Sequence, residues 1–260
     1  MRPYQIRPRS EECALVIPAR RHSTRLPDKL LLRETGKSVL QHTFEAACQA
    51  QHPQSVLIAT DDVEIATQAR RFGAKVIMTS ADCPSGTDRV AEAVREDTSG
   101  AGIIVNLQGD EPEINPEAID LLVESLWENP GASMATLATP IRDRKMLDDP
   151  ACVKVVFDDA GQALYFSRST IPHPREWDEE LLQATPANFH QHIGIYAYRR
   201  TLLLRLAALP MGRLEGLEKL EQLRVLENGE KIIVALVDEP TRGIDTPEDY
   251  AEFVARRLAG

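Results

Sequence analysis

The chain has 260 residues, of which 43% are hydrophobic and 27% charged, values typical of a folded globular protein. It carries 30 lysines and arginines against 40 aspartates and glutamates, so its formal net charge is −10. This balance excludes a protein that holds nucleic acid through many phosphate contacts, because such binding needs a broad cationic surface. An anionic ligand must therefore be bound by a local cluster of basic residues.

The cysteines and the apolar segments predict the cellular setting. The four cysteines are widely spaced and form no C-x-x-C pair, which is typical of a reduced, cytoplasmic protein. Residues 1–12 contain three arginines with no apolar segment behind them, so we expect a mobile tail rather than a secretion signal. The longest apolar runs, such as IIVALV at 232–237, are far shorter than the about 20 residues of a membrane helix. We therefore expect a cytoplasmic protein with no membrane-spanning segment.

The first half of the chain alternates strand and helix patterns. The apolar run CALVIP at 13–18 predicts the first strand, and helical spacing begins only near Val39, after a long polar loop. A helix then follows, with Asp61 or Asp62 as its N-cap and Gly73 just beyond its end. Further strands are predicted at 56–60, 75–79 and 102–110, with a helix at 88–97. This alternation predicts an α/β fold, with a mostly parallel twisted sheet and helices on both faces.

The second half departs from this alternation. After a helix predicted at 116–128, with Asn115 as N-cap, the segments 153–157 and 163–167 flank a turn rich in Asp and Gly and predict an antiparallel hairpin. One long helix is predicted over 214–229, with leucines at every third position that would face two neighbours, one of them a second copy of the chain. The remaining predictions are strands at 134–141, 192–198 and 231–237, a helix at 201–209, and a last helix over 246–260 capped by Thr246 and Asp249. No linker divides residues 13–260, so we expect a single domain.

A basic loop follows the first strand. Ligands of open α/β sheets bind outside the carboxyl ends of the strands, which is where this loop is predicted to lie. It places Arg20, Arg21, Arg25 and Lys29 within ten residues of an otherwise acidic chain, and so predicts a phosphate-binding loop. It lacks the glycines of a Walker A loop, so the side chains would neutralise the phosphates. The alternative is a solvated basic loop.

Two acidic turns are predicted at the same edge of the sheet. The segment 102–110 is predicted as a short buried strand that runs into a polar turn, and Asp110 lies in that turn. Asp245 precedes the last helix. Mg²⁺ is usually held by one or two carboxylates together with substrate phosphates, so these residues predict a magnesium site opposite the basic loop. The alternatives are that Asp110 only shapes its turn and that Asp245 only assists the helix cap, although Thr246 already serves as that cap.

Taken together, the motifs closely resemble those of the CMP-Kdo synthetases, the 3-deoxy-manno-octulosonate (Kdo) cytidylyltransferases of lipopolysaccharide assembly. The stretches that carry this resemblance include VIPARRHSTRLPDKLL (16–31), SGTDRVAEAV (85–94), IVNLQGDEP (104–112), VKVVFDDAGQALYFSRSTIP (153–172), HIGIYAYR (192–199) and GIDTPEDY (243–250). The chain departs from the family where Asp28-Lys29-Leu30-Leu31 replaces a frequent Gly-Lys-Pro-Leu. It departs again at Gly216, where a His is frequent, which bears on the contacts expected around Glu215.

The resemblance implies a cytoplasmic, Mg²⁺-dependent homodimer of nucleotidyltransferase fold that converts CTP and Kdo to CMP-Kdo and diphosphate. An antiparallel insertion, approximately 134–228, would bind the sugar and form the dimer. Arg20, Lys29, Asp110 and Asp245 would be catalytic, and the two aspartates would bind the metal. The nucleotide would contact Arg20, Ser23, Arg25, Lys29, Ser85, Gly86, Thr87 and Gln108. The sugar would contact Gln108, Arg168, His192, Tyr196, Glu221 and Gln222.

The residues agree with this chemistry on independent grounds. In-line attack by a sugar hydroxyl on a phosphate requires positioning and charge neutralisation more than a covalent intermediate. Arg168 is a natural bidentate partner for a carboxylate, with an ordinary surface ion pair as the alternative. His192 and Tyr196 share one strand face, although a lone strand His is more often a packing residue. Glu221 and Gln222 share one arc of the long predicted helix, where a solvated face is the alternative.

Three other functions compete with this prediction. Within the class, the acceptor could be another acid sugar, such as 8-amino-Kdo or sialic acid. A non-catalytic nucleotide-sugar binding protein is a second alternative, against which the presence of both carboxylates and the basic loop argues. An NAD-dependent oxidoreductase would require G-x-G-x-x-G after the first strand, where Pro18-Ala19-Arg20-Arg21 stands instead.

Overall fold

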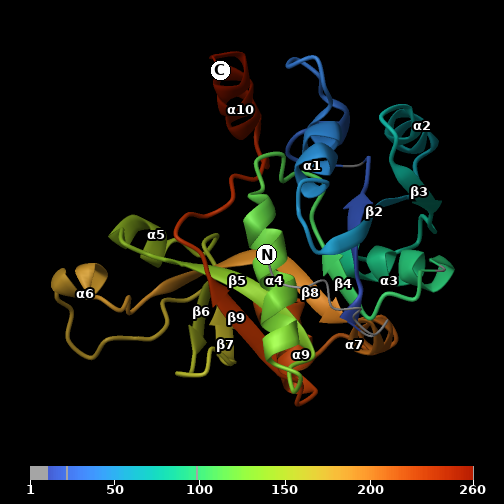
Figure 1. The fold of residues 1–260 in the computed structure, drawn as a ribbon. Coiled ribbons are helices and arrows are strands. Elements are labelled where there is room, and N and C mark those ends of the chain that lie inside the picture. Colours follow the sequence, from blue (N-terminus) through green and yellow to red (C-terminus); the bar gives the residue numbers. More distant parts are fainter. Residues whose placement is uncertain (1–10, 22, 98, 260) are drawn as a thin grey trace, which may run out of the picture.

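The computed structural model describes residues 11–21, 23–97 and 99–259. Most of the segment expected to be a mobile tail therefore lies outside the described residues. The described chain forms one nine-stranded sheet (Figure 1). Its strands are β1 (Cys13–Ala19), β2 (Pro53–Thr60), β3 (Lys75–Met78), β4 (Ile103–Asn106), β5 (Met134–Pro140), β6 (Lys154–Phe157), β7 (Ala163–Ser167), β8 (His190–Arg199) and β9 (Ile232–Leu236).

The sheet is parallel in its first half and mixed in its second. The main strand order is β3-β2-β1-β4-β8-β5-β9, and β6 joins it beside β8 with β7 paired to β6. Strands β3, β2, β1 and β4 are parallel, whereas β8 runs antiparallel to both β4 and β5. The predicted α/β class is confirmed. The central position of β8 could not be derived from the order of elements, because it follows a long excursion of the chain.

Helices cover both faces of the sheet, as predicted. The longer ones are α1 (Val39–Ala47), α2 (Val63–Arg71), α3 (Gly86–Glu96), α4 (Pro116–Glu128) and α10 (Pro247–Ala259). The shorter ones are α5 (Arg144–Asp148), α6 (Glu180–Gln183), α7 (Arg200–Leu206), α8 (Arg213–Glu218) and α9 (Gln222–Glu227), with a 3₁₀ turn at Lys29–Leu31.

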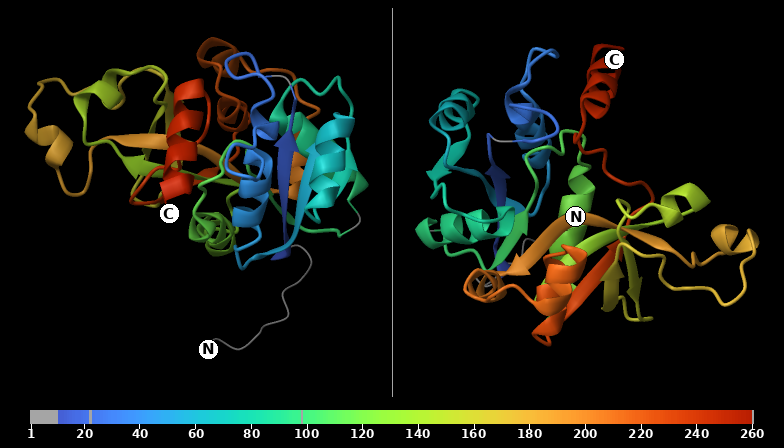
Figure 2. Two further views of the ribbon diagram at one scale, coloured as in Figure 1. Left: turned by 90° about the horizontal axis from the view of Figure 1, so that it is seen from above. Right: turned by 180° about the vertical axis from the view of Figure 1, so that it is seen from behind.

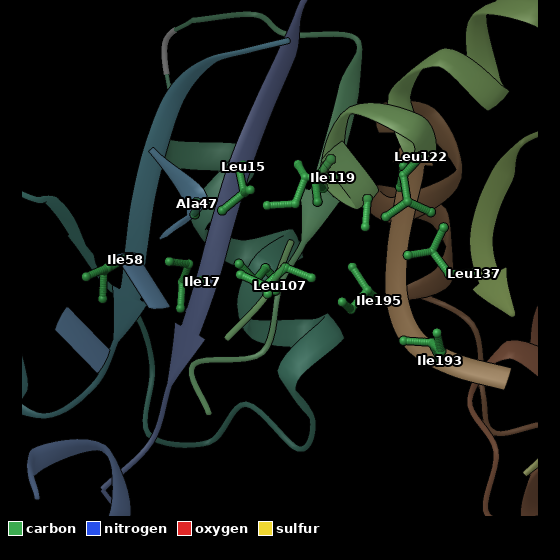
Figure 3. Packing of buried hydrophobic residues seen from close by; sticks show 14 of the residues in the cluster. Leu15, Ile17, Ala47, Ile58, Leu107, Ile119, Leu122, Leu137, Ile193 and Ile195 are labelled. Carbon is green, nitrogen blue, oxygen red and sulfur yellow. The ribbon is translucent and has the colours of Figure 1, made fainter. Parts of the chain in front are cut away.

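Strand β1 is buried along its whole length because it lies between two cores. On one face Leu15 and Ile17 pack against Ile119 of α4, in the cluster shown in Figure 3. On the other face Val16 belongs to a second cluster with Val90 of α3. A strand covered by helices on both faces must be continuously apolar, which is the pattern of CALVIP.

The helix boundaries follow local capping chemistry. The carboxylate of Asp62 caps α2 by accepting hydrogen bonds from the backbone N–H groups of Glu64 and Ile65, and Gly73 follows the helix with φ +88°. Helix α4 has the predicted bounds and the predicted Asn115 cap. Helix α3 starts two residues earlier than predicted, because Ser85 caps it. At α10, Thr246 and Asp249 form the reciprocal capping contacts expected from the sequence.

The prediction of one long helix over 214–229 was wrong. Lys219 adopts a left-handed conformation with φ +56° and separates α8 from α9. A guanidinium–carboxylate pair between Arg224 of α9 and Glu215 of α8 joins the two helices across the break. Leucines spaced three apart drift around a straight helix, whereas the break buries Leu223 in the core and leaves Leu217 71% exposed.

The predicted hairpin is confirmed, since β6 and β7 pair antiparallel with Gly161 at φ +77° in the turn. Helix α5, which precedes β6, and helix α6, which follows β7, extend to one side of the molecule (Figures 1 and 2). This arm has a small apolar cluster of its own, made by Ile141, Leu147, Cys152, Leu182 and Phe189. The assignment of 134–228 to sugar binding and dimer formation stays a prediction.

None of the helices in the described part of the chain combines the length and the apolar character that crossing a membrane requires. The four cysteines are unpaired.

Candidate functional site

The three polar segments predicted at the edge of the sheet come together around one cavity of about 360 Å³. Strands β1 and β4 are parallel neighbours, so the loop after β1 and the turn after β4 leave the sheet on the same side. The backbone N–H of Ile244 donates a hydrogen bond to the carbonyl of Asp110 (2.9 Å), which brings the segment before α10 to this edge. The lining residues are Pro18, Arg20, Ser23, Thr24, Arg25, Lys29, Leu30, Gly86, Gln108, Gly109, Asp110 and Asp245.

Lys29 lies between the two predicted metal ligands. Its side chain is largely buried, and its Nζ is 2.5 Å from Oδ2 of Asp110 and 3.3 Å from Oδ1 of Asp245. It also donates a hydrogen bond to the carbonyl of Ile244 (2.6 Å). Arg25 contacts the same Asp245 oxygen at 3.1 Å. Each basic residue of the loop that contacts Asp245 is therefore placed where it could alternatively meet an anionic ligand.

The donor set fits a magnesium ion. One cationic nitrogen of Lys29 is shared by both carboxylates, so the two can also reach a common metal ion. Two carboxylates are what Mg²⁺ usually takes from a protein, with water and phosphate oxygens completing its octahedron. Among the residues that the structure describes, no group of three or more His, Cys, Asp or Glu side chains is arranged to hold a metal ion. Water or substrate oxygen atoms would therefore complete the coordination of a metal ion at this place.

The N-terminus of α3 forms one wall of the cavity through Gly86. A helix N-terminus presents unpaired N–H groups and favours negative charge. Close to this helix start, Arg20 donates a hydrogen bond to the carbonyl of Cys83 (3.1 Å), two residues before the Ser85 cap, which fixes the guanidinium beside the cavity. Of the nucleotide-binding candidates, Ser85 and Thr87 do not line the cavity: Ser85 caps α3, and Thr87 bonds the Tyr198 hydroxyl.

A chain of hydrogen bonds connects three of the sugar-binding candidates. The Tyr196 hydroxyl donates to Oε1 of Gln222 (3.3 Å), and Nε2 of Gln222 lies 3.4 Å from Nδ1 of His192. Nε2 of His192 lies 2.9 Å from the hydroxyl of Thr136, which itself donates to the carbonyl of Ile195 (2.9 Å). Because the Thr136 hydrogen is used by a carbonyl, the network assigns the imidazole proton to Nε2 and leaves Nδ1 as an acceptor.

This network is neutral at physiological pH. Burial lowers the pKa of His192 to about 3, so the imidazole carries no charge at pH 7. Burial also raises the pKa of Tyr196 above its usual value, and the nearby Glu221 carboxylate adds to that effect. The ring of Phe166 packs edge-on against His192 with centroids 4.9 Å apart. His192 and Gln222 are both buried, as expected of packing residues, and the fixed, uncharged donors and acceptors of the network suit hydroxyl groups better than phosphates.

Arg168 and Glu221 lie outside this network. The Arg168 guanidinium donates to the carbonyl of Glu218 (2.8 Å) and to that of Pro150 (3.0 Å), and among the described residues it forms no ion pair. The Glu218 carboxylate instead accepts from the Ser167 hydroxyl and from the backbone N–H of Arg168. Glu221 is exposed at the start of α9. Gln108 lines the cavity, so it is the sugar-binding candidate nearest the basic loop.

Sequence reasoning missed three residues at the site. Thr136 anchors His192 and is one of the two threonines in the otherwise apolar stretch MATLATPI, where a buried hydroxyl needs a hydrogen-bond partner. The hydroxyl of Tyr198, whose pKa burial raises, contacts Thr87 next to the start of α3. Glu111 follows Asp110, and burial of its carboxyl, with a contribution from the charge of Asp110, raises its pKa to about 7. The pair of adjacent acidic residues after a buried strand could have indicated from the sequence that Glu111 also lies at the site.

Comparison with known proteins places these features in context. A family model described as "Cytidylyltransferase" matches residues 14–232. A 3-deoxy-manno-octulosonate cytidylyltransferase of Rhodopirellula baltica is 50% identical over 248 residues, covering 94% of this chain and 98% of the relative. An 8-amino-3,8-dideoxy-manno-octulosonate cytidylyltransferase of Shewanella halifaxensis is 46% identical over 244 residues, covering 93% and 97%. A solved structure of CMP:2-keto-3-deoxy-manno-octonic acid synthetase complexed with CTP superimposes with a TM-score of 0.88 at 40% identity, covering 95% and 99%.

Proposed function

The chain belongs to the cytidylyltransferase family that includes the 3-deoxy-manno-octulosonate enzymes, and on this basis we propose that it converts CTP and Kdo to CMP-Kdo and diphosphate. The observation that carries the proposal is the meeting of Lys29, Asp110 and Asp245 at one cavity. A cluster of this charge pattern suits a nucleoside triphosphate with its metal ion, and the neutral His192 network suits a polyhydroxylated acceptor.

Arg20, Arg25 and Lys29 bind the triphosphate in this proposal. Their charges offset the negative charge that builds on the departing diphosphate, which is the main requirement of phosphoryl-type transfer. The N–H groups at the start of α3 lie beside the same cavity, with Gly86 keeping the approach open. Asp110 and Asp245 hold Mg²⁺, which when bound supplies further charge neutralisation at the phosphates.

The anomeric hydroxyl of the sugar attacks the α-phosphorus in line with the leaving group. A new phosphorus–oxygen bond forms to the sugar, and the bond to the β-phosphate oxygen breaks with its electron pair going to diphosphate. The hydroxyl proton leaves to water. The chain's own residues position the two reactants and exclude alternative geometries, so no covalent enzyme intermediate is required.

The sugar-binding set comprises Gln108, Arg168, His192, Tyr196, Glu221 and Gln222. His192, Tyr196 and Gln222 form the uncharged network described above, and in this proposal they offer hydrogen bonds to sugar hydroxyls. Arg168 is the candidate for the sugar carboxylate, because its planar guanidinium is held at the end of β7 by two backbone carbonyls. The proposal further includes Mg²⁺ as cofactor, a homodimer formed through the 134–228 region and a cytoplasmic location.

The test is release of diphosphate by the purified protein supplied with CTP, Mg²⁺ and one acid sugar at a time. We expect release with Kdo. The arm with 8-amino-Kdo addresses the alternative raised by the Shewanella relative, and sialic acid addresses the third acceptor. Preference for either of these sugars would replace Kdo as the substrate, and no release with any of them would refute the proposed activity.

A further inference from the structure

Glu111 and Gly243 meet across the two turns that carry the predicted metal ligands. Glu111 follows Asp110 in the turn after β4, and Gly243 precedes Asp245 by two residues in the segment before α10. A Cβ atom built on Gly243 would lie 2.8 Å from Oε1 and 3.3 Å from Cδ of Glu111. Carbon atoms of real side chains are not found that close to a carboxylate oxygen, so any other residue at 243 would require the Glu111 carboxyl to shift.

The backbone conformation does not require glycine at this position. Gly243 has no positive φ, in contrast to Gly73 or Gly161, so an alanine here would be free of backbone strain. The absence of a side chain at 243 therefore serves the close approach of Glu111 alone. Oε2 of Glu111 is shielded from solvent and has no hydrogen-bond partner among the described residues. Because this oxygen has neither solvent nor a hydrogen-bond partner among these residues, the packing around the carboxyl is what keeps it in place.

Two further contacts join the same turns. The side chain of Thr241 interacts with the Glu111 carboxyl. The backbone N–H of Ile244 donates to the carbonyl of Asp110 (2.9 Å). The turn after β4 and the segment 241–245 are thereby held together on both sides of Glu111, and the segment ends at Asp245.

We propose that Glu111 is a positioning residue which, by packing on the bare backbone of Gly243, sets the separation between the carboxylates of Asp110 and Asp245. The inference rests on the proposed function for its metal ion. Outer residues that orient metal ligands typically change metal affinity by about 10- to 100-fold when they are altered. Glu111 touches neither substrate in this proposal, and it acts through the position of Asp245.

A pair of complementary substitutions tests this packing. Gly243→Ala introduces a methyl group against the Glu111 carboxyl, and Glu111→Asp withdraws the carboxyl by one methylene. Each single variant disturbs the spacing, whereas in the double variant the alanine methyl fills the space that the shorter side chain leaves. The matched control is Gly131→Ala, because a Cβ at Gly131 meets nothing within 4 Å and that glycine also has no positive φ.

The measurements are the dissociation constant for Mn²⁺, from the electron paramagnetic resonance signal of free Mn²⁺ titrated with protein, the Mg²⁺ concentration at half-maximal diphosphate release, and the melting temperature. We expect Gly243→Ala to raise the Mn²⁺ dissociation constant by about tenfold or more. We expect the double variant to bind Mn²⁺ more tightly than either single variant, and Gly131→Ala to match the wild type. A merely structural role would lower the melting temperature without this reciprocal rescue.

Three results would overturn the inference: Mn²⁺ binding by Gly243→Ala at the wild-type level, a double variant as impaired as the sum of the two single variants, or no Mn²⁺ binding by the wild type. Failure of the proposed function is distinguishable, because the Mn²⁺ titration uses no sugar and no nucleotide. If the wild type releases no diphosphate with any acid sugar while the Mn²⁺ rescue is observed, the reaction is wrong and the positioning role stands.

Discussion

Nζ of Lys29 lies 2.5 Å from Oδ2 of Asp110, so a cation of the basic loop is paired with a carboxylate 81 positions away in the chain. The pair joins the loop after β1 to the turn after β4, and Asp245 shares the same ammonium group. In the proposed reaction these groups have different roles: the carboxylates bind the metal ion and the lysine contacts phosphate. Their contact indicates that binding of a metal–nucleotide complex replaces one set of ionic contacts by another.

The carboxylates are expected to be essential for turnover. Asp110→Asn and Asp245→Asn each remove a metal ligand while preserving side-chain shape, so we expect diphosphate release to fall by at least about 10²-fold. The melting temperature of each variant should stay close to that of the wild type, which is the control for folding. Near-normal rates for both variants would place the metal ion elsewhere.

Lys29→Met is expected to reduce kcat/KM for CTP by about 10²-fold or more, because the ammonium group that meets the developing negative charge in the proposed reaction is lost from a largely buried position. Steady-state kinetics with CTP varied at saturating Kdo measure this effect. Lys37→Met is the matched control, since Lys37 forms an exposed pair with Glu45 on α1 and does not line the cavity. Equal effects of the two substitutions would contradict the role of Lys29.

The network around His192 should affect the sugar and not the nucleotide. Tyr196→Phe removes the hydroxyl that donates to Gln222, so we expect KM for Kdo to rise by about tenfold and KM for CTP to be unchanged. Tyr250→Phe removes a hydroxyl that accepts from the backbone N–H of Glu34 near α10, and it serves as the control. A rise in the KM for CTP alone would place Tyr196 outside the sugar site.

His192 should make stability depend on pH. Burial lowers its pKa to about 3 in the folded protein, whereas the unfolded chain has a value near 6.5. Below pH 6.5 the unfolded state therefore binds a proton that the folded state does not, and lowering the pH favours unfolding. The free energy of unfolding should fall by up to about 1.4 kcal/mol per pH unit from this group between pH 6.5 and 3.

Denaturant unfolding at several pH values measures this pH dependence. His192→Gln is the comparison, because the carboxylates of the protein titrate equally in the wild type and in this variant. The wild-type curve should be steeper than the variant curve below pH 6.5. Parallel curves would show that His192 gains its proton as readily in the folded state as in the unfolded chain.

Substitutions at the break between α8 and α9 should change the free energy of unfolding. Lys219 adopts φ +56°, a conformation that glycine reaches without the penalty of a side chain. Lys219→Gly should therefore raise the free energy of unfolding by up to about 1 kcal/mol, and Lys219→Val should lower it. Denaturant unfolding at neutral pH measures both. An increase with Val and a decrease with Gly would contradict the left-handed conformation at this position.

The sequence by itself determined the α/β class, the hairpin of β6 and β7, the caps of α2, α4 and α10, and the three segments that carry the basic and acidic candidates. These are local properties, because periodicity, capping and turn chemistry depend on residues a few positions apart. Asp110 and Lys29 could also be placed at one edge of the sheet, because each follows one of the parallel strands, whose carboxyl ends meet there.

Only the tertiary structure decided how distant segments meet. The insertion of β8 between β4 and β5 places Thr136 beside His192. The break at Lys219 directs the Gln222 side chain to His192. A straight helix would have kept Glu218, Glu221 and Gln222 on one arc. The contact of Glu111 with Gly243 likewise depends on where the chain returns after more than a hundred residues. Such contacts are settled by the packing of whole elements against a shared core, which no local pattern records.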